Sequence, residues 1–396
     1  MNLDYFAKSY LTLGLRINKH IKGYVEHYYG PSEIKTAIDI EEKVSPKKLL
    51  QDCKSLMVQI RDQGFEEKRK NFLNKNLIAF DTVLRKLNGE KISYLEQVER
   101  LFAFKPILYK DDYFYHLTSR ANDLYKGKGS LNNRIKKYSA QRIIPKDKVK
   151  NLFIKAINLT KNRTIEVFPN LLPNNESIEI TEVENQSWTA YDWYQGNYNS
   201  RVEININRIQ YWTSLLYLTC HEVYPGHHTE RTMKDYLLYR SKGCFECSLL
   251  SIYTPEMVIS EGIGQVAERV IFDPLESVKI SLENFCANPE IEDSLDILIQ
   301  QKEIREGFRR LQCNLAYYKY VDGLLEKDLI KYAESFKVIP EEGIKGIIEF
   351  ISDELWGSYI MVYQGERLIT EKFGKRPSPE QFRRLLTEQT LPCELF

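Results

Sequence analysis

The chain has 396 residues, with 56 Lys and Arg against 55 Asp and Glu, so its formal net charge is only +1. This balance argues against a nucleic-acid-binding protein, because such proteins gather a basic excess on one face. Apolar residues make up 43% of the chain, which suffices for a packed core and excludes global disorder. No apolar run is long enough to span a bilayer and the start carries no secretory signal, so we expect no membrane partner and a cytoplasmic location.

The first 170 residues are expected to be helical. A buried helical stripe is predicted from apolar residues that recur at spacings of three and four, namely Leu3, Phe6, Tyr10, Leu13 and Ile17. The same rhythm continues over 45–87, 94–104, 111–125 and 146–168. The basic stretch 126–137 contains Gly and Ser and is predicted to be a solvated loop. A turn-rich link, PNLLPNNES, then predicts a boundary near residue 170, between an N-terminal helical region (1–170) and a C-terminal region (171–396).

Two runs in the second region alternate apolar and polar residues, as half-buried strands do. They are Ser177–Val183 and Arg201–Asn207, and they flank an aromatic segment rich in Gly and Asn. The remainder, to residue 396, again has helical periodicity. We therefore expect a mainly α fold with a small β-sheet.

Three of the six histidines lie close together in the run CHEVYPGHHTE. Zinc enzymes commonly carry H-E-x-x-H on a helix, because histidines four residues apart can reach one metal and the Glu beside the first takes a proton from water. Here His221 and Glu222 match, but Pro225 occupies the position of the second histidine. In an unbroken helix neither His227 nor His228 could share a metal with His221.

Pro225 and Gly226 prevent an unbroken helix, since proline lacks the amide donor and glycine admits a turn. The chain can therefore fold back and bring His227 or His228 to the metal, and the residues alone leave that choice open. The alternative is a helix C-terminus whose histidines favour the negative end of the helix dipole. Because that alternative does not account for the adjacent Glu222, we favour the metal site.

A second motif, SEGIGQVAE, supplies a candidate third ligand, Glu261, 40 residues after His221. The glycines one and three residues after Glu261 would let another helix approach closely. A carboxylate here completes the His-His-Glu set that leaves one zinc position open to water. Glu268, Glu230 and His228 are predicted to support the ligating histidines.

The motifs HEVYPGHH and SEGIGQVAE together resemble the bacterial DUF885 family, whose members carry HExxPGHH and a later EGxxxxAE. The segments GYVEHYYGP, GNYNSRVEININ and YQGERLI are also similar to family segments, so the similarity extends over most of the chain. The family resembles helical zinc metallopeptidases, in which a cleft divides two mostly helical halves. The resemblance therefore implies a zincin-like helical architecture.

The resemblance further implies one zinc ion per chain, with His221, His227 and Glu261 as its ligands and Glu222 as the general base. The expected function is a zinc-dependent hydrolase of short peptides, of the carboxypeptidase or dipeptidase type. Two alternatives stay open: a metal-dependent hydrolase of a non-peptide amide or ester, and an inactive helical scaffold that binds peptides.

Three further residues are candidates for contacts with a substrate. In helical metallopeptidases a strand beside the cleft pairs with the substrate, and Arg201–Asn207, with Asn205 as a substrate-binding residue, is expected to be that edge strand. Tyr359, Tyr363 and Arg367 fall at steps of four on an expected helix. The Tyr363 hydroxyl would stabilise the oxyanion formed at a carbonyl, and Arg367 would hold a substrate carboxylate with two hydrogen bonds.

Overall fold

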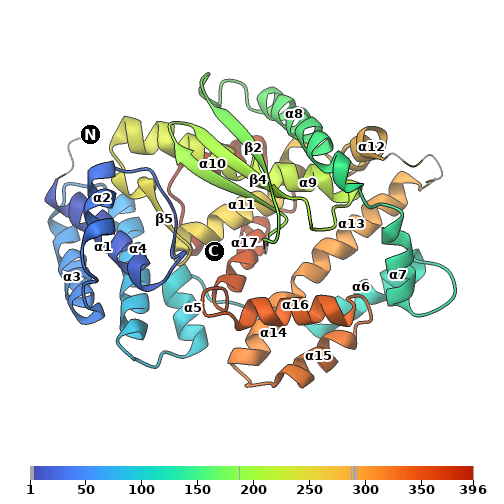
Figure 1. Ribbon diagram of the computed structural model, residues 1–396, viewed down its shortest axis with the longest axis horizontal. Coiled ribbons are helices and arrows are strands. Elements are labelled where there is room, and N and C mark those ends of the chain that lie inside the picture. Colours follow the sequence, from blue (N-terminus) through green and yellow to red (C-terminus); the bar gives the residue numbers. More distant parts are fainter. Residues whose placement is uncertain (1–3, 187, 287, 289–290, 292, 396) are drawn as a thin grey trace.

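The computed structural model describes residues 4–186, 188–286, 288, 291 and 293–395. Helices dominate, and they surround a three-stranded sheet and a two-stranded ribbon (Figure 1). The elements up to residue 170 are α1 (Tyr5–His20), β1 (Val25–Tyr28), α2 (Ser32–Ile40), α3 (Pro46–Gln59), α4 (Glu67–Leu87), α5 (Tyr94–Phe102), α6 (Asp111–Leu124), α7 (Leu131–Ala140) and α8 (Val149–Val167). The mainly α fold with small sheets is confirmed.

The elements after residue 170 include strands, α-helices and shorter 3-10 or π-helical segments. They are β2 (Ser177–Val183), β3 (Ala190–Gly196), β4 (Asn199–Asn205), α9 (Trp212–Glu222), α10 (His227–Lys234), a π-helical segment η3 (Asp235–Arg240), β5 (Leu249–Ser251), α11 (Pro255–Ile271), α12 (Pro274–Phe285), α13 (Leu295–Arg309), α14 (Leu311–Tyr320), α15 (Glu326–Glu334), α16 (Glu341–Ser352), a 3-10 helix η5 (Tyr359–Gln364), α17 (Gly365–Phe373) and α18 (Pro379–Thr387). Short 3-10 turns occur at Ile60–Asp62, Lys146–Lys148, Phe245–Ser248 and Pro392–Glu394.

The predicted stripe is buried in α1 where the structure describes it: Phe6, Tyr10, Leu13 and Ile17 are each at most 2% exposed. Leu3 lies outside the described residues. The helix begins at Asp4, whose side chain accepts a hydrogen bond from the Ala7 amide. This hydrogen bond fixes the start of the helix, because the amides of the first turn have no partner within the helix itself. The other long stretches with helical rhythm also contain helices.

The prediction of a solvated loop over 126–137 is wrong in its second half. Ser130 caps α7, accepting a hydrogen bond from the Asn133 amide. Leu131 is the one buried residue of this helix, so the helix has almost no apolar stripe for a sequence pattern to reveal. Capping and local propensity define the helix here.

The three-stranded sheet has the order β2-β4-β3, with β2 parallel and β3 antiparallel to β4. β3 and β4 form a hairpin whose turn residues, Asn197 and Tyr198, have positive φ angles of 55° and 65°. β2 has the predicted bounds, and β4 lies two residues earlier than predicted. β3 escaped prediction because its inward face carries Asp192, which breaks the apolar alternation.

A single hydrophobic cluster extends from Phe6 to Leu395, and residues on both sides of position 170 contribute to it. The link near residue 170 therefore does not separate two cores, and the division into two regions stays a prediction. α11 passes through the middle of the molecule, between α9, α10 and α17 (Figure 1). The contact with α17 is close because a Cβ at Gly262 would lie 2.8 Å from the carbonyl carbon of Gly365. This confirms the predicted close approach of a helix.

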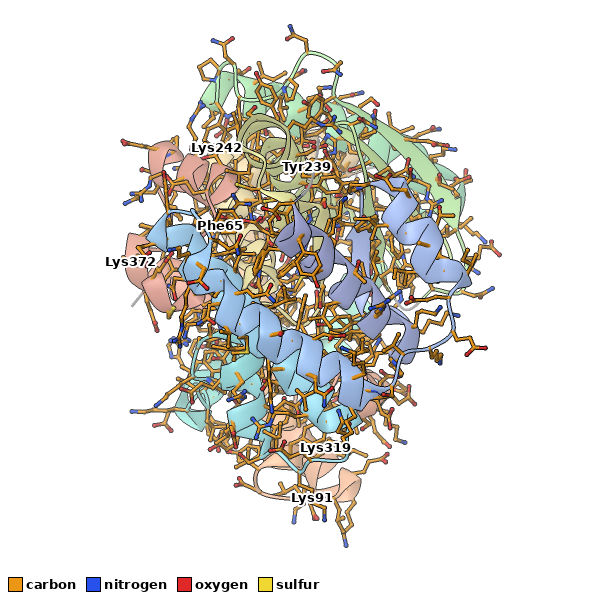
Figure 2. All side chains as sticks on the ribbon, turned by 90° about the vertical axis from the view of Figure 1, so that its left-hand side faces the viewer. Phe65, Lys91, Tyr239, Lys242, Lys319 and Lys372 are labelled. Atoms are coloured by element: carbon orange, nitrogen blue, oxygen red, sulfur yellow. The ribbon has the colours of Figure 1, made fainter. Side chains whose placement is uncertain are left out.

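The N-terminal helices form an outer layer on one side of the molecule, with Lys242 and Lys91 towards opposite ends of the face in Figure 2. A short strand links this layer to the centre. β1 pairs antiparallel with β5, which leads directly into α11. The link brings the segment around Glu26 to the middle of the fold. Across the described part of the chain, none of the helices combines the length and the apolar character needed to cross a membrane.

Candidate metal centre

The turn after α9 places two histidines against each other. α9 ends at Glu222, the Tyr224–Pro225 peptide is cis, and α10 begins at His227. A Cβ at Gly226 would lie only 1.9 Å from the carbonyl oxygen of His221, so this close return of the chain requires glycine. The rings of His221 and His227 are 4.7 Å apart, centroid to centroid. The turn thus compensates for the missing H-E-x-x-H spacing.

α11 supplies the third ligand. Glu261 Oε2 lies 3.6 Å from His221 Nε2. One candidate ligand atom from each of His221, His227 and Glu261 lies within 4.8 Å of the other two. The backbone of Gly264 packs against the His221 ring, and a Cβ there would lie 2.7 Å from its Nδ1 and Cε1 atoms. The second glycine of the motif therefore admits an imidazole rather than a helix.

The donor set fits a zinc ion on three counts. Two imidazoles and one carboxylate are ligands that zinc takes in catalytic sites. Burial, followed by the charge of Arg231, lowers the pKa of His227 to about 3, and burial also lowers that of His221, so both rings are neutral and able to ligate. Glu261 Oε2 is buried and has no hydrogen-bond partner among the described residues. A cation would satisfy that atom.

Four carboxylates gather around this cluster against one arginine, Arg231. Burial raises the pKa of Glu261 to about 7 and that of Asp192 to about 6. The pKa of Glu222 is raised well above its ordinary value by burial and then by the charges of Glu261, Asp192 and Glu26. A divalent cation reverses this tendency, because it stabilises the ionised form of nearby carboxylates.

Glu230 supports His227 through a serine. The Ser260 hydroxyl donates a hydrogen bond of 2.6 Å to Glu230 Oε2 and lies 3.2 Å from His227 Nδ1. Because the Ser260 proton is donated to Glu230, the Ser260 oxygen accepts a hydrogen bond from Nδ1–H of His227. This tautomer leaves Nε2 of His227 available for a metal. Lys234 Nζ lies 2.7 Å from the other oxygen of Glu230 and keeps that carboxylate ionised.

The other two residues expected to support the ligands lie elsewhere. The ring of His228 contacts Ser200 Oγ at 2.8 Å and Glu176 Oε2 at 2.9 Å, so it joins α10 to the sheet. Glu268 pairs with Lys302 on α13 at 2.5 Å and accepts a hydrogen bond from Ser277 on α12. The prediction that they support the ligating histidines is therefore corrected. Helical periodicity indicates which face of a helix a residue occupies, but the element packed against that face determines what the residue contacts.

The cluster opens into a cavity of about 770 Å³. Its wall includes the two histidines, Arg231, the carboxylates described above and six aromatic rings, Trp188, Tyr191, Phe350, Trp356, Tyr359 and Tyr363. The Tyr359 hydroxyl donates a hydrogen bond of 2.6 Å to Glu261 Oε1 and so orients that ligand. Tyr363 also lines the cavity, and its hydroxyl makes no hydrogen bond to any residue that the structure describes.

Arg367 does not contribute to this cavity. Tyr359 and Tyr363 belong to the 3-10 helix η5, whereas Arg367 belongs to α17, where its Nη1 lies 2.7 Å from Glu371. A 3-10 helix has about three residues per turn, so steps of four do not stay on one face. The expectation of one regular helix is therefore wrong. The substrate contact expected of Arg367 depended on that helix and is corrected with it.

The expected edge strand is also wrong. β4 is the central strand of its sheet, so both of its edges are paired, and β3 is the edge strand that borders the cavity. Asn205 is 1% exposed, and its amide donates to the carbonyl oxygens of Gln186 and Trp188. Its donors thus hold the chain before β3, and a substrate contact by Asn205 has no support.

Several cavity residues were not found in the sequence. Tyr191 donates a hydrogen bond of 2.6 Å to Glu26, and Arg231 Nη2 lies 3.5 Å from the same carboxylate. Asp192 lies next to this network on β3. A signal was present, since an acidic residue interrupts each of two aromatic runs, YVEHYY and YDWY. For Arg231, the only signal in the sequence was its position directly after the histidine motif.

No family model and no curated protein matches this chain. Among solved structures, it is similar to one described as a "putative lipoprotein" from Colwellia psychrerythraea, with 14% identity over 88% of this chain and 68% of that chain, and a TM-score of 0.55. Another, described as a "putative lipoprotein of unknown function" from Shewanella oneidensis, has 13% identity over 90% of this chain and 76% of that chain, and a TM-score of 0.46. The first likeness shows a shared, mainly helical fold.

Proposed function

We propose that this chain is a zinc-dependent hydrolase that cleaves short peptides, with a zincin-like helical architecture. The observation that carries the proposal is that single atoms of His221, His227 and Glu261 lie within 4.8 Å of one another at the wall of a cavity. These residues come from the two motifs that resemble the DUF885 family, so we propose that family as well. A cytoplasmic location stays a prediction from the sequence.

The chain's own residues divide the chemistry between them. A zinc ion, when bound, supplies Lewis acidity and lowers the pKa of water towards ~7. Glu222 Oε1 lies 4.0 Å from His221 Nε2, where it takes a proton from the attacking water and passes it to the leaving nitrogen. Tyr363 donates its free hydroxyl to the oxygen that becomes negative.

The edge strand β3 supports a peptide as the substrate. It runs along the cavity and pairs on one side only, with β4. An extended peptide can add to such an edge through main-chain hydrogen bonds, which give affinity without demanding one sequence. The aromatic rings of Trp188 and Tyr191, 5.3 Å apart, offer apolar surface for alternate side chains of that peptide.

The test begins with the metal content of protein purified without a His tag, measured by elemental mass spectrometry. We expect about one zinc per chain in the wild type and in Glu222→Gln. Turnover of a peptide library should fall by about 10²–10⁴-fold in Glu222→Gln, the range lost with a general base. Glu342→Gln, at an exposed position of α16, is the matched control and should behave as the wild type.

Two results would overturn the proposal. Failure to retain zinc after incubation and dialysis would refute the proposed metal site. Near-normal turnover by Glu222→Gln would refute the role of Glu222 as the general base. A substrate panel that also contains acylated amines and esters separates the alternatives. Hydrolysis confined to those compounds would leave a zinc hydrolase that is not a peptidase, and zinc binding without any turnover would leave a scaffold.

A further inference from the structure

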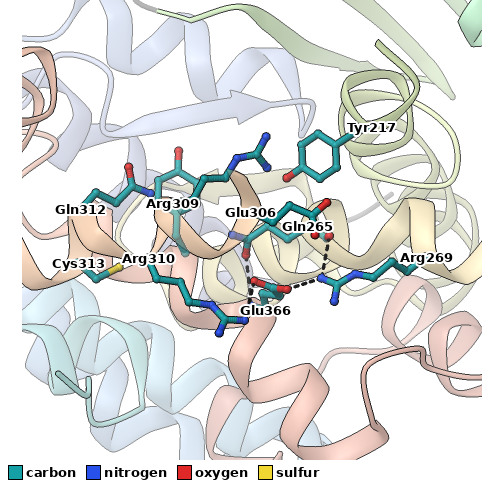
Figure 3. A pocket seen from close by; sticks show the side chains of 10 residues that line it. Tyr217, Gln265, Arg269, Glu306, Arg309, Arg310, Gln312, Cys313 and Glu366 are labelled. Atoms are coloured by element: carbon teal, nitrogen blue, oxygen red, sulfur yellow. Dashed lines mark hydrogen bonds and ion pairs between the residues drawn. The ribbon is translucent and has the colours of Figure 1, made fainter. Parts of the chain in front are cut away.

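The metal cavity adjoins two further cavities on one side. Tyr363 lines both the metal cavity and a second cavity of about 360 Å³, whose wall carries Arg269, Arg309 and Arg310 (Figure 3). Arg309 in turn lines a third cavity of about 1110 Å³. Tyr363 is thus shared by the first two cavities, and Arg309 by the second and third.

Arg309 differs from its two neighbours in having no acidic partner. Arg269 and Arg310 both pair with Glu366, Arg310 at 3.4 Å, and Figure 3 shows these two side chains converging on that carboxylate. No carboxylate of the described residues lies within 4.0 Å of the Arg309 guanidinium, which is stacked over the Tyr217 ring at 4.2 Å from its centroid. The stacking, together with a hydrogen bond to the Tyr217 side chain, fixes the guanidinium, which carries further N–H donors.

The distance from Arg309 to the zinc ligands suits a short stretch of peptide. Tyr217 and His221 lie one turn apart on α9, with ring centroids 5.8 Å apart. This separation and that of Arg309 from Tyr217 place the guanidinium no more than about 10 Å from the His221 ring. An extended chain advances ~3.3–3.6 Å per residue. A carboxylate one or two residues beyond a bond at the zinc site is therefore within reach.

The third cavity fits an apolar side chain attached to such a carboxylate. Its wall is largely aromatic and aliphatic, with Ile304, Phe308, Val338 and Ile347 among its residues, and none of its described lining residues is acidic. Arg309 lies where this cavity meets the second one. A residue with an apolar side chain and a free carboxylate matches this combination of surfaces.

Another neighbour of the metal cavity has a different character. Trp356 is shared with a larger cavity of about 2140 Å³. The lysines and carboxylates of its wall are equal in number: Lys22, Lys86 and Lys91 against Glu90, Asp353 and Glu354. This cavity has no net positive charge to select a carboxylate, and its volume admits a longer segment of peptide.

We propose that Arg309 binds the C-terminal carboxylate of the substrate, which makes this chain a carboxypeptidase that removes an apolar residue or a short piece from the C-terminus. The inference rests on the proposed function. Water adds to the carbonyl carbon at the zinc site, the C–N bond breaks, the water oxygen stays in the new carboxylate, and Glu222 carries the proton to the released nitrogen. The shortened peptide extends past Trp356.

The test compares acetyl-Ala-Ala-Phe with its C-terminal amide, using zinc-loaded full-length protein. We expect kcat/KM for the free acid to exceed that for the amide by about 100-fold, because the amide cannot form the charge-assisted pair with the guanidinium. Arg309→Met should remove that preference by slowing hydrolysis of the acid alone. Arg376→Met makes the same charge change at an exposed position and should keep the preference.

Binding supplies a second readout that does not depend on turnover. In the Glu222→Gln background, calorimetric titration should show the acid binding about 100-fold more tightly than the amide, and Arg309→Met should remove the difference. Should the methionine variant not fold, Arg309→Lys keeps the charge without the planar fork and should retain only part of the preference. Equal cleavage of acid and amide by the wild type would overturn this inference while leaving the hydrolase; cleavage of neither, nor of any panel substrate, would overturn both.

Discussion

Gly264→Ala should weaken zinc binding without unfolding the protein. The new Cβ would lie 2.7 Å from Nδ1 and Cε1 of His221, whereas ordinary contact begins at 3.4 Å. The ring, or the helix that carries Gly264, must therefore move by about 0.7 Å. Metal–ligand distances in such sites are held to within ~0.2 Å, so a displacement of this size is large for the ligand and small for the helix.

The expected magnitudes differ for folding and for the metal. Alanine is favoured over glycine inside a helix by ~1 kcal/mol, and overpacking a core costs ~1–3 kcal/mol. The free energy of unfolding of the metal-free protein should therefore change by at most about 2 kcal/mol. Zinc affinity should fall about 10–100-fold, as it does when the support of a ligand is removed.

Chelator competition measures the affinity, and denaturant unfolding of the metal-free protein measures the stability. The matched control is Gly346→Ala in α16, where a Cβ would meet no atom within 4 Å. It gains the same helix propensity and should bind zinc as the wild type does. If Gly264→Ala bound zinc within twofold of the wild type, the reasoning that this close contact fixes His221 would be refuted.

Three other substitutions have distinct expected outcomes. Tyr359→Phe, which removes the hydrogen bond to Glu261, should lower zinc affinity about 10-fold, whereas Tyr363→Phe should lower kcat alone; chelator competition and turnover assays that gave the same result for both variants would contradict these roles. Burial alone would raise the pKa of Glu176, but His228, Lys161 and Tyr224 lower it from 4.5 to about 2, so its contribution to stability is present above pH 4.5 and is lost as the pH falls towards 2. Glu176→Gln should thus destabilise by about 3 kcal/mol at pH 7 and by less at pH 4, and a difference that does not change with pH in denaturant unfolding would be inconsistent with this.

The parts of the site that lie close together in the sequence could be predicted. Pro225 and Gly226 indicated a return of the chain, and the structure places His227 against His221 as that return requires. Glu261 was predicted by its glycine neighbours, which mark a close approach. In each case a backbone requirement of proline or glycine was visible in the sequence.

The parts supplied by distant segments could not be predicted. Glu26 reaches the cavity because β1 pairs with β5, and no local pattern in the sequence encodes that pairing. Arg367 was favoured as the carboxylate ligand because a regular helix was assumed, whereas the chain is a 3-10 helix up to Gln364. Glu306 and Glu366 line the same cavity as Arg309, but no described carboxylate lies within 4.0 Å of its guanidinium. The surrounding sequence, IREGFRR, is crowded with charges, so this lack of an ion pair cannot be predicted from it.

The wall of the metal cavity combines Glu26, from the second element of the chain, with Tyr363, from near its end. Contacts between such remote segments form only after the intervening chain is in place. During synthesis, the ribosome releases Glu26, Glu222 and Glu261 well before Tyr363 exists. The cavity in which we propose that peptides are cleaved is therefore incomplete in a nascent chain, so neighbouring unfolded polypeptides meet no finished site.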